Sequence, residues 1–197
     1  MTPSRATEQA WTPTEERVEI LLSLRTVLDE DRVSRDTVLS RAARVLARSL
    51  GDAVAIDLLS ADARWMVPIG VDHPDRAPRD ALREILGVRF RADEGFTANV
   101  VDRQEPVLIP RVTSAEIRAL QPAIAKVCEK LGMRGFVAVP LAVRGSLLGI
   151  LWQIRTRPDP VLTQDDQRFA EEVASRLAFA LMCFPGWDAG DSDSTAG

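Results

Sequence analysis

The chain has 197 residues, about the length of one domain, with 46% hydrophobic residues and a formal net charge of -4. This composition can supply a buried core, which excludes a disordered protein. No stretch approaches the roughly 20 apolar residues of a membrane span, and the N-terminus lacks the apolar region of a signal peptide. Basic residues are scattered among acidic ones, so we expect no nucleic-acid or membrane partner and a cytoplasmic location.

Two helices are predicted at the start of the chain. Thr12 followed by Pro13 is typical of an N-cap and the first helical position, and a stripe of apolar residues continues from there to about Asp31. Ser34 and Gly51 are typical of the start and the end of a second helix.

Alternating apolar residues predict two strands next, over residues 54–59 and 65–69. Pro68 lies inside the second strand, and because proline cannot donate a ladder hydrogen bond, we expect an edge position or a bulge there. The clearest β signal is a hairpin over residues 134–155, in which apolar residues alternate on both sides of a turn at Gly145.

Residues 71–131 mix short helical and strand patterns, and a helix capped by Thr163 follows the hairpin. Within the mixed segment, the sequence predicts short elements in this order: a helix over 79–86, a strand at 88–90, a helix after Glu94, a strand over 106–110, and a helix from Thr113 that is interrupted at Pro122. This order suits an α+β domain, a central antiparallel sheet of about five or six strands with helices packed on it.

Several short runs, in their order and spacing, resemble the GAF domain family over roughly residues 15–184. These runs are Gly95–Val101, Pro106–Pro110, Val139–Leu141 with Gly145, Leu148–Leu151, Leu162–Asp166 and Phe169–Ala174. The resemblance implies a single domain over residues 12–184, which we expect between a flexible leader (1–11) and a disordered tail (185–197).

The resemblance also implies a function. Such a domain encloses a small ligand between the sheet and the 71–131 crossover, and its terminal helices commonly pair across a dimer. We therefore expect a non-catalytic sensory or regulatory module that signals through its terminal helices as a homodimer, with a downstream signalling protein as a further partner. The alternative is a protein–protein interaction or dimerisation module without a ligand.

Residues that serve well-known chemistries of the family are missing. Bilin photoreceptors of this family hold their chromophore through a Cys at a fixed spacing before a Met-Gly-Val element. The matching element here is Leu131–Met133, and the Cys position is occupied by Ala123. Cyclic-nucleotide-binding members carry an Asn-Lys pair, whereas the only asparagine, Asn99, is followed by Val100. We therefore expect neither a covalent bilin nor the cyclic-nucleotide signature.

Two cysteines, Cys128 and Cys183, are too few for a disulfide framework or a metal site. Methionine sulfoxide reductases with this fold need several cysteines near the pocket, which this chain does not supply. We interpret Cys128 as a small buried helix residue and expect no catalytic residues.

His73 is the only histidine. Haem-binding members of the family use a His between the crossover strand and the hairpin, and residues 111–133 contain none. Because Pro74 follows it in a turn-like sequence, we interpret His73 as a solvated loop residue, with haem ligation as the alternative. No cofactor is expected.

The pocket implied by the resemblance would be apolar. We expect its lining to be Phe90, Phe96, Val100, Ile109, Leu120, Ile124, Phe136 and Trp152, and Trp65 could also reach it. Each of these residues could instead simply fill the core. If the ligand has an anionic end, we expect Arg91, Arg111 or Arg134 to bind it.

Overall fold

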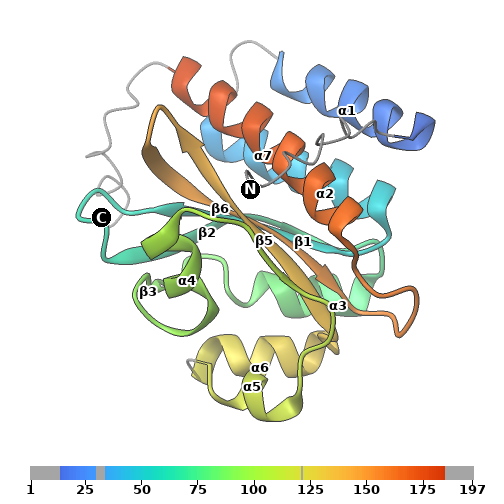
Figure 1. Ribbon diagram of the computed structural model, residues 1–197, viewed down its shortest axis with the longest axis vertical. Coiled ribbons are helices and arrows are strands. Elements are labelled where there is room, and N and C mark those ends of the chain that lie inside the picture. The colour runs from blue at the N-terminus through green and yellow to red at the C-terminus, as the bar shows by residue number, and fades with distance from the viewer. Residues whose placement is uncertain (1–13, 30–33, 121, 185–197) are drawn as a thin grey trace, which may run out of the picture.

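The computed structural model describes residues 14–29, 34–120 and 122–184, which form one six-stranded antiparallel sheet covered by helices on both faces (Figure 1). The expected leader and tail, residues 1–11 and 185–197, lie outside the described residues. The strand order is β3-β2-β1-β6-β5-β4. In chain order the elements are α1 (Glu15–Leu28), α2 (Arg35–Leu50), β1 (Ala53–Leu59), β2 (Trp65–Asp72), α3 (Arg76–Arg83), β3 (Phe90–Arg91), α4 (Gly95–Arg103), β4 (Val107–Ile109), α5 (Ser114–Arg118), α6 (Pro122–Leu131), β5 (Gly135–Val143), β6 (Ser146–Arg155) and α7 (Gln164–Cys183).

The period-two alternation of the strands produces two cores, one on each face of the sheet. In β1, Val54 and Ile56 belong to the core beneath α1, α2 and α7. Ala53 and Ala55 belong to the core on the opposite face, which the short helices α3 to α6 cover. Figure 1 shows these helices as a second layer across the sheet from α1, α2 and α7, and we call residues 71–131 the roof.

Two β predictions are confirmed. The hairpin of β5 and β6 lies in the interior of the sheet, flanked by β1 and β4. The register between β1 and β2 shifts at Ile56 and Asp57, which pair with Gly70 and Pro68, so Ile69 forms the bulge expected beside Pro68.

Helix boundaries were predicted with mixed success. Thr113 and Thr163 each form a capping box as expected, and Pro122 begins a new helix. The first helix is shorter than predicted: its N-cap is Thr14, whose side chain accepts from the backbone N–H of Arg17, and it ends at Leu28 rather than near Asp31. The predicted cap Thr12 and the proline after it lie outside the described residues.

Helix α1 folds back over α2 and α7 of its own chain rather than packing directly on the sheet. Leu24 is fully buried there. At the N-terminal end of α7, Arg17 pairs with Asp166 at 2.8 Å and lies over the ring of Phe169. The two terminal helices of the chain are therefore in direct contact.

A buried polar cluster lies at the end of the sheet where β1 begins and β6 ends. Asp52 is fully buried, accepts a hydrogen bond from Gln153 at 2.8 Å and faces Arg155 at 2.9 Å. Burial raises the pKa of Asp52, while the Gln153 hydrogen bond and the Arg155 charge oppose the rise. Arg155 also donates to the carbonyl of Pro160, so the cluster anchors the loop between β6 and α7.

The start of the roof has a similar anchor. Asp72, at the end of β2, is buried and pairs with Arg79 of α3 at 3.1 Å. The Arg79 side chain also donates to the backbone carbonyls of His73 and Pro74.

In the part of the chain that the structure describes, no helix is long and apolar enough to span a membrane.

Candidate functional site

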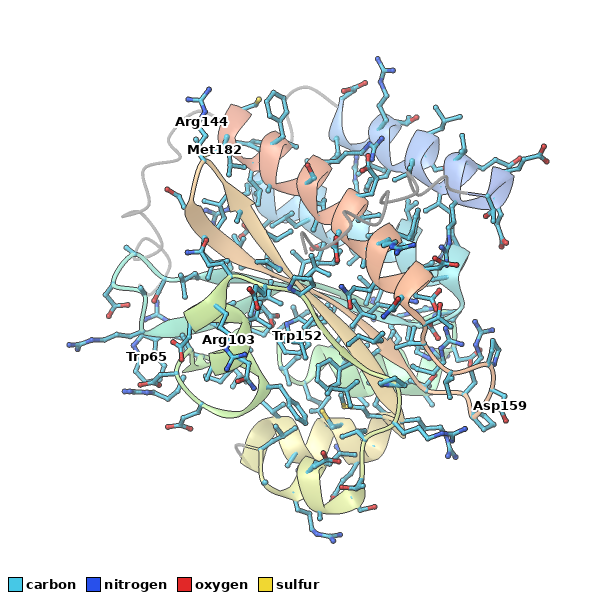
Figure 2. All side chains as sticks on the ribbon, viewed as in Figure 1. Trp65, Arg103, Arg144, Trp152, Asp159 and Met182 are labelled. Atoms are coloured by element: carbon cyan, nitrogen blue, oxygen red, sulfur yellow. The ribbon has the colours of Figure 1, made fainter. Side chains whose placement is uncertain are left out.

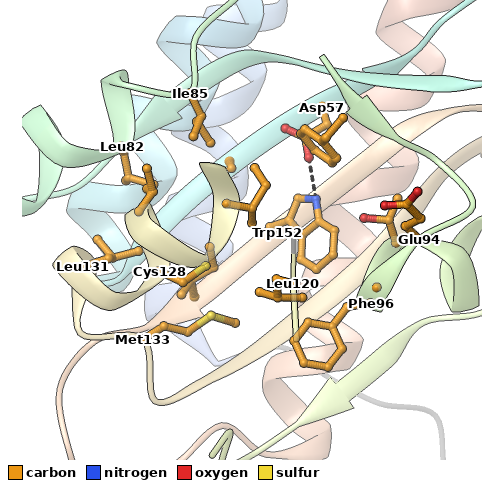
Figure 3. Close-up of a pocket in the computed structure, with 17 residues that line it drawn as sticks. Asp57, Leu82, Ile85, Glu94, Phe96, Leu120, Cys128, Leu131, Met133 and Trp152 are labelled. Atoms are coloured by element: carbon orange, nitrogen blue, oxygen red, sulfur yellow. Dashed lines mark hydrogen bonds between the residues drawn. The ribbon is translucent and has the colours of Figure 1, made fainter. Parts of the chain in front are cut away.

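A pocket of about 80 Å³ lies between the sheet and the roof (Figure 3). Its floor comes from β1 and β6, and its walls come from α3, α4, α6 and the residues around β3 and α5. The lining is mostly apolar: Ala55, Asp57, Leu82, Ile85, Phe90, Glu94, Gly95, Phe96, Thr97, Leu120, Ile124, Val127, Cys128, Leu131, Met133, Trp152 and Ile154. At ~10–15 Å³ per water-sized site, this volume holds roughly five to eight non-hydrogen atoms.

Local backbone geometry brings two sulfur-containing side chains to this wall. Gly132 follows α6 with φ of +70°, and the backbone N–H of Met133 donates to the carbonyl of Cys128 at 3.0 Å. This is the Schellman end of a helix, in which glycine adopts the left-handed conformation without a Cβ clash. The chain therefore returns so that Met133 and Cys128 both face the pocket (Figure 3).

One ionisable side chain is buried in the floor. Asp57 is 3% exposed, and its Oδ2 accepts a hydrogen bond from Trp152 Nε1 at 2.8 Å. Its Oδ1 is buried and has no hydrogen-bond partner among the described residues. Burial raises the pKa of Asp57 to about 7, against a lowering by the Trp152 hydrogen bond. Sequence reasoning missed Asp57, although a single acid in the otherwise apolar strand 54–59 was the available signal.

The expected lining residues divide into two groups. Phe90, Phe96, Leu120, Ile124 and Trp152 line the pocket. Val100, Ile109 and Phe136 lie in the same core but outside the lining.

The aromatic residues form a cluster of tilted rings that explains why Phe136 does not line the pocket. The Phe136 ring centroid lies 4.7 Å from that of Phe96 and 5.6 Å from that of Trp152, so Phe136 supports the two lining rings from behind. Trp65 does not line the pocket; its ring packs under the guanidinium of Arg91, at the edge of the sheet away from Trp152 (Figure 2).

The expected anion-binding arginines are not at the pocket. Arg91 pairs with Asp93 at 2.5 Å, Arg111 is an exposed residue beside Asp159, and Arg134 is exposed. None of the three lines the pocket. The expectation that these residues hold an anionic ligand end is therefore wrong. Their side chains lie on the outer surface of the elements that they flank.

The interpretation of His73 as a solvated loop residue is also wrong. His73 is 2% exposed, its Nε2 lies 3.0 Å from Thr156 Oγ1, and its Nδ1 accepts from the backbone N–H of Asp75 at 2.9 Å. Both ring nitrogens are thus engaged, and His73 does not line the pocket. These contacts fit a structural histidine and give no support to haem ligation.

His73 should make stability depend on pH. Burial lowers the pKa of His73 below its usual 6.5, so the unfolded chain takes up a proton before the folded protein does. The stability that neutral His73 confers is complete above pH 6.5 and declines as pH falls through the lower pKa of the folded state. We expect His73→Asn, whose amide oxygen replaces the Nδ1 acceptor, to remove this decline in urea unfolding between pH 7.5 and 5. If the stability of His73→Asn depended on pH as that of the wild type does, His73 would not be the source of the decline.

The two thiols differ sharply. Cys128 is buried on the roof side of the sheet, and burial raises its pKa to about 12, whereas Cys183 is exposed at the end of α7 on the other side. Thiolate is the reactive form of cysteine, so Cys128 should be inert. We expect a thiol reagent to label one cysteine of the folded protein rapidly, and Cys183→Ser to abolish that labelling. Rapid labelling that persists in Cys183→Ser would show that Cys128 is reactive.

Among the residues described, no group of three or more His, Cys, Asp or Glu side chains is arranged to hold a metal ion. The polar side chains of the pocket lining are those of Asp57, Glu94, Thr97 and Cys128.

A family model described as GAF domain matches residues 34–181. This chain belongs to the GAF domain family. No protein with a curated description matches it significantly. The GAF domain of a phosphoenolpyruvate-protein phosphotransferase from Coxiella burnetii is 18% identical, covers 85% of this chain and 93% of its own, and has a TM-score of 0.67.

Two other solved structures are similar to this chain. The free methionine-R-sulfoxide reductase of Neisseria meningitidis, in complex with its substrate, is 16% identical, with coverage of 87% and 93% and a TM-score of 0.62. A phycoerythrobilin-bound GAF domain from a cyanobacterial phytochrome is 17% identical, with coverage of 88% and 96% and a TM-score of 0.58. At these identities the likeness establishes the GAF fold. Members of the family are typically sensory or regulatory.

Proposed function

We propose that this GAF domain is a non-catalytic cytoplasmic sensor that binds a small molecule between the sheet and the roof. The pocket of about 80 Å³, with a buried carboxylate in an otherwise mostly apolar lining, is the observation that carries the proposal. The fold lends support, because the solved relatives include one in complex with its substrate and one with a bound bilin. Two free cysteines fit a reducing compartment.

Strand β6 offers a route from the pocket to the terminal helices. Trp152 lines the pocket, while its neighbour Leu151 belongs to the opposite core together with Phe169 of α7. A ligand that displaces Trp152 therefore acts on a strand whose other face supports α7. Because Arg17 pairs with Asp166, α1 would follow α7.

Exposed apolar side chains on the terminal helices support a homodimer. Val18 and Leu22 on α1 are 42% and 58% exposed, and Phe179 and Met182 on α7 are 68% and 44% exposed. We propose that a second copy covers these side chains, so that the helices of two protomers form a bundle. A downstream signalling protein would then recognise the rearranged bundle.

The side chains around the pocket favour binding over catalysis. A thiol with a pKa of about 12 is a poor nucleophile, and His73 is committed to contacts away from the pocket. The proposed binding function therefore differs from the reductase activity in the name of the Neisseria relative.

Matched cysteine variants test ligand binding. Cys128→Phe should fill the pocket, whereas Cys183→Phe adds the same ring on the exposed end of α7. Native mass spectrometry of the purified protein should detect a bound small molecule in the wild type and Cys183→Phe and none in Cys128→Phe.

A thermal-shift library screen provides the second readout. A ligand at ~100 times its dissociation constant should stabilise the wild type by about 2.7 kcal/mol and Cys128→Phe not at all. Absence of both a bound mass and any thermal shift in the wild type would favour the alternative, a ligand-free interaction and dimerisation module.

A further inference from the structure

Asp57 is a polar recognition group inside an apolar pocket. Its carboxylate lies at the indole N–H edge of Trp152 (Figure 3). Oδ2 accepts the Trp152 hydrogen bond, and Oδ1 has no hydrogen-bond partner among the described residues. A buried acceptor without a donor destabilises the fold, whether the carboxyl is ionised or not. Asp57 lines the pocket, so a ligand donor that bonds to its carboxyl group would offset this penalty.

The alternation of β1 places Asp57 on the roof side of the sheet. Ala53 and Ala55 belong to the core on that face, and Asp57 lines the pocket beside Ala55. Asp57 also pairs with Pro68, at the point where the register between β1 and β2 shifts.

The charge of the lining selects the sign of the ligand. Among the 17 lining residues, Asp57 and Glu94 are acidic and none is basic. Glu94 is exposed, so it lies at the rim while Asp57 lies at the floor. Glu94 Oε1 lies 3.9 Å from Arg91 Nε, so the rim carboxylate has a counter-charge, whereas the lining offers no basic side chain to Asp57. The buried Asp57 carboxylate therefore disfavours an anion and favours a cation.

Aromatic faces favour the same kind of ligand. Phe96 and Trp152 both line the pocket, and ring faces attract ammonium groups through their quadrupole. The remaining wall, from Leu82 and Ile85 to Ile124 and Val127, is aliphatic and suits an uncharged hydrocarbon body.

We propose that the pocket binds a small amphiphilic amine, whose ammonium N–H donates to the Asp57 carboxylate while its hydrocarbon body packs against the α3 and α6 walls. The inference rests on the proposed ligand-binding function and names the chemical class of the ligand. The raised pKa of Asp57 is consistent with a carboxylate that becomes ionised when a cation arrives.

Three probes of similar shape test the charge preference: isopentylammonium, isopentanol and isovalerate. The readout is the indole N–H resonance of Trp152 in nitrogen-15 correlation spectra, which Trp152→Phe identifies among the four tryptophans. At pH 8 the ammonium should bind about tenfold more tightly than the alcohol, the usual difference between charged and neutral hydrogen bonds. Isovalerate should leave the resonance unchanged, and the ammonium preference should weaken at pH 6.

Asp57→Asn keeps an oxygen for Trp152 and removes the charge, so the ammonium and the alcohol should then bind within about twofold of each other. Asp102→Asn, which removes an exposed carboxylate from α4 outside the pocket, should retain the tenfold preference. Equal binding of the two probes to the wild type, or a preference that survives in Asp57→Asn, would overturn the amine inference and leave the pocket as a binding site. Failure of all three probes to shift Trp152 would count against both proposals.

Discussion

Replacing Asp57 by asparagine is expected to raise the free energy of unfolding by up to about 4 kcal/mol at pH 8 and to leave it nearly unchanged near pH 4. Burial raises the pKa of Asp57 from 3.8 to about 7, so the folded protein holds a proton that the unfolded chain releases. The wild type is therefore penalised increasingly as pH rises from 3.8 to about 7, and the penalty is complete above that. Urea unfolding of both proteins across this range measures the difference.

Asp102→Asn is the matched control, because the same chemical change at an exposed site of α4 should shift stability by at most about 0.5 kcal/mol at every pH. A difference between Asp57→Asn and the wild type that does not grow with pH would show that Asp57 titrates normally. Asp57 lowers the stability of the wild type as pH rises, whereas His73 lowers it as pH falls. The variants Asp57→Asn and His73→Asn therefore separate the two pH effects on stability.

Arg155→Ala should destabilise the fold by roughly 3–5 kcal/mol, the usual effect of removing one partner of a buried ion pair. Asp52 is fully buried, and Arg155 lies 2.9 Å from its Oδ1. The variant would leave this carboxylate with the Gln153 hydrogen bond and the more distant Arg157, at 3.7 Å. Chemical denaturation at neutral pH measures the loss.

Arg157→Ala is the control, because the Arg157 side chain is 47% exposed and its pairing with the same carboxylate should contribute at most about 1 kcal/mol. The double variant Asp52→Leu with Arg155→Met should recover most of the stability lost in Arg155→Ala, since an apolar pair of similar size leaves no buried charge. A loss in Arg155→Ala no larger than that in Arg157→Ala would contradict the account of this cluster.

Local signals predicted the elements whose structure depends on local contacts. The capping boxes at Thr113 and Thr163 satisfy backbone N–H groups within one helical turn, and the hairpin over 134–155 pairs residues that are close in sequence. The family resemblance then predicted a pocket between the sheet and the 71–131 crossover, and five of the eight expected pocket residues line the cavity.

The errors about site residues concern side chains whose surroundings come from distant parts of the chain. His73 resembles a turn residue in sequence, but its partner Thr156 lies 83 positions away, at the end of β6. Asp57 occupies one position in the alternating pattern of a strand, and its burial follows from the roof that covers it. The arginines expected at the pocket flank the right elements but lie on their outer surface, which spacing alone does not specify.

Methionine methyl groups offer the most direct test that a small molecule enters the pocket and that the terminal helix responds. Met133 lines the pocket, whereas Met182 is an exposed residue near the end of α7. In carbon-13 methyl spectra, titration with isopentylammonium and isopentanol should shift Met133 saturably and perturb Met182 with the same midpoint. Cys128→Phe should abolish both responses. A Met133 signal that stays unchanged at saturating probe, or one that moves while Met182 does not, would contradict the account.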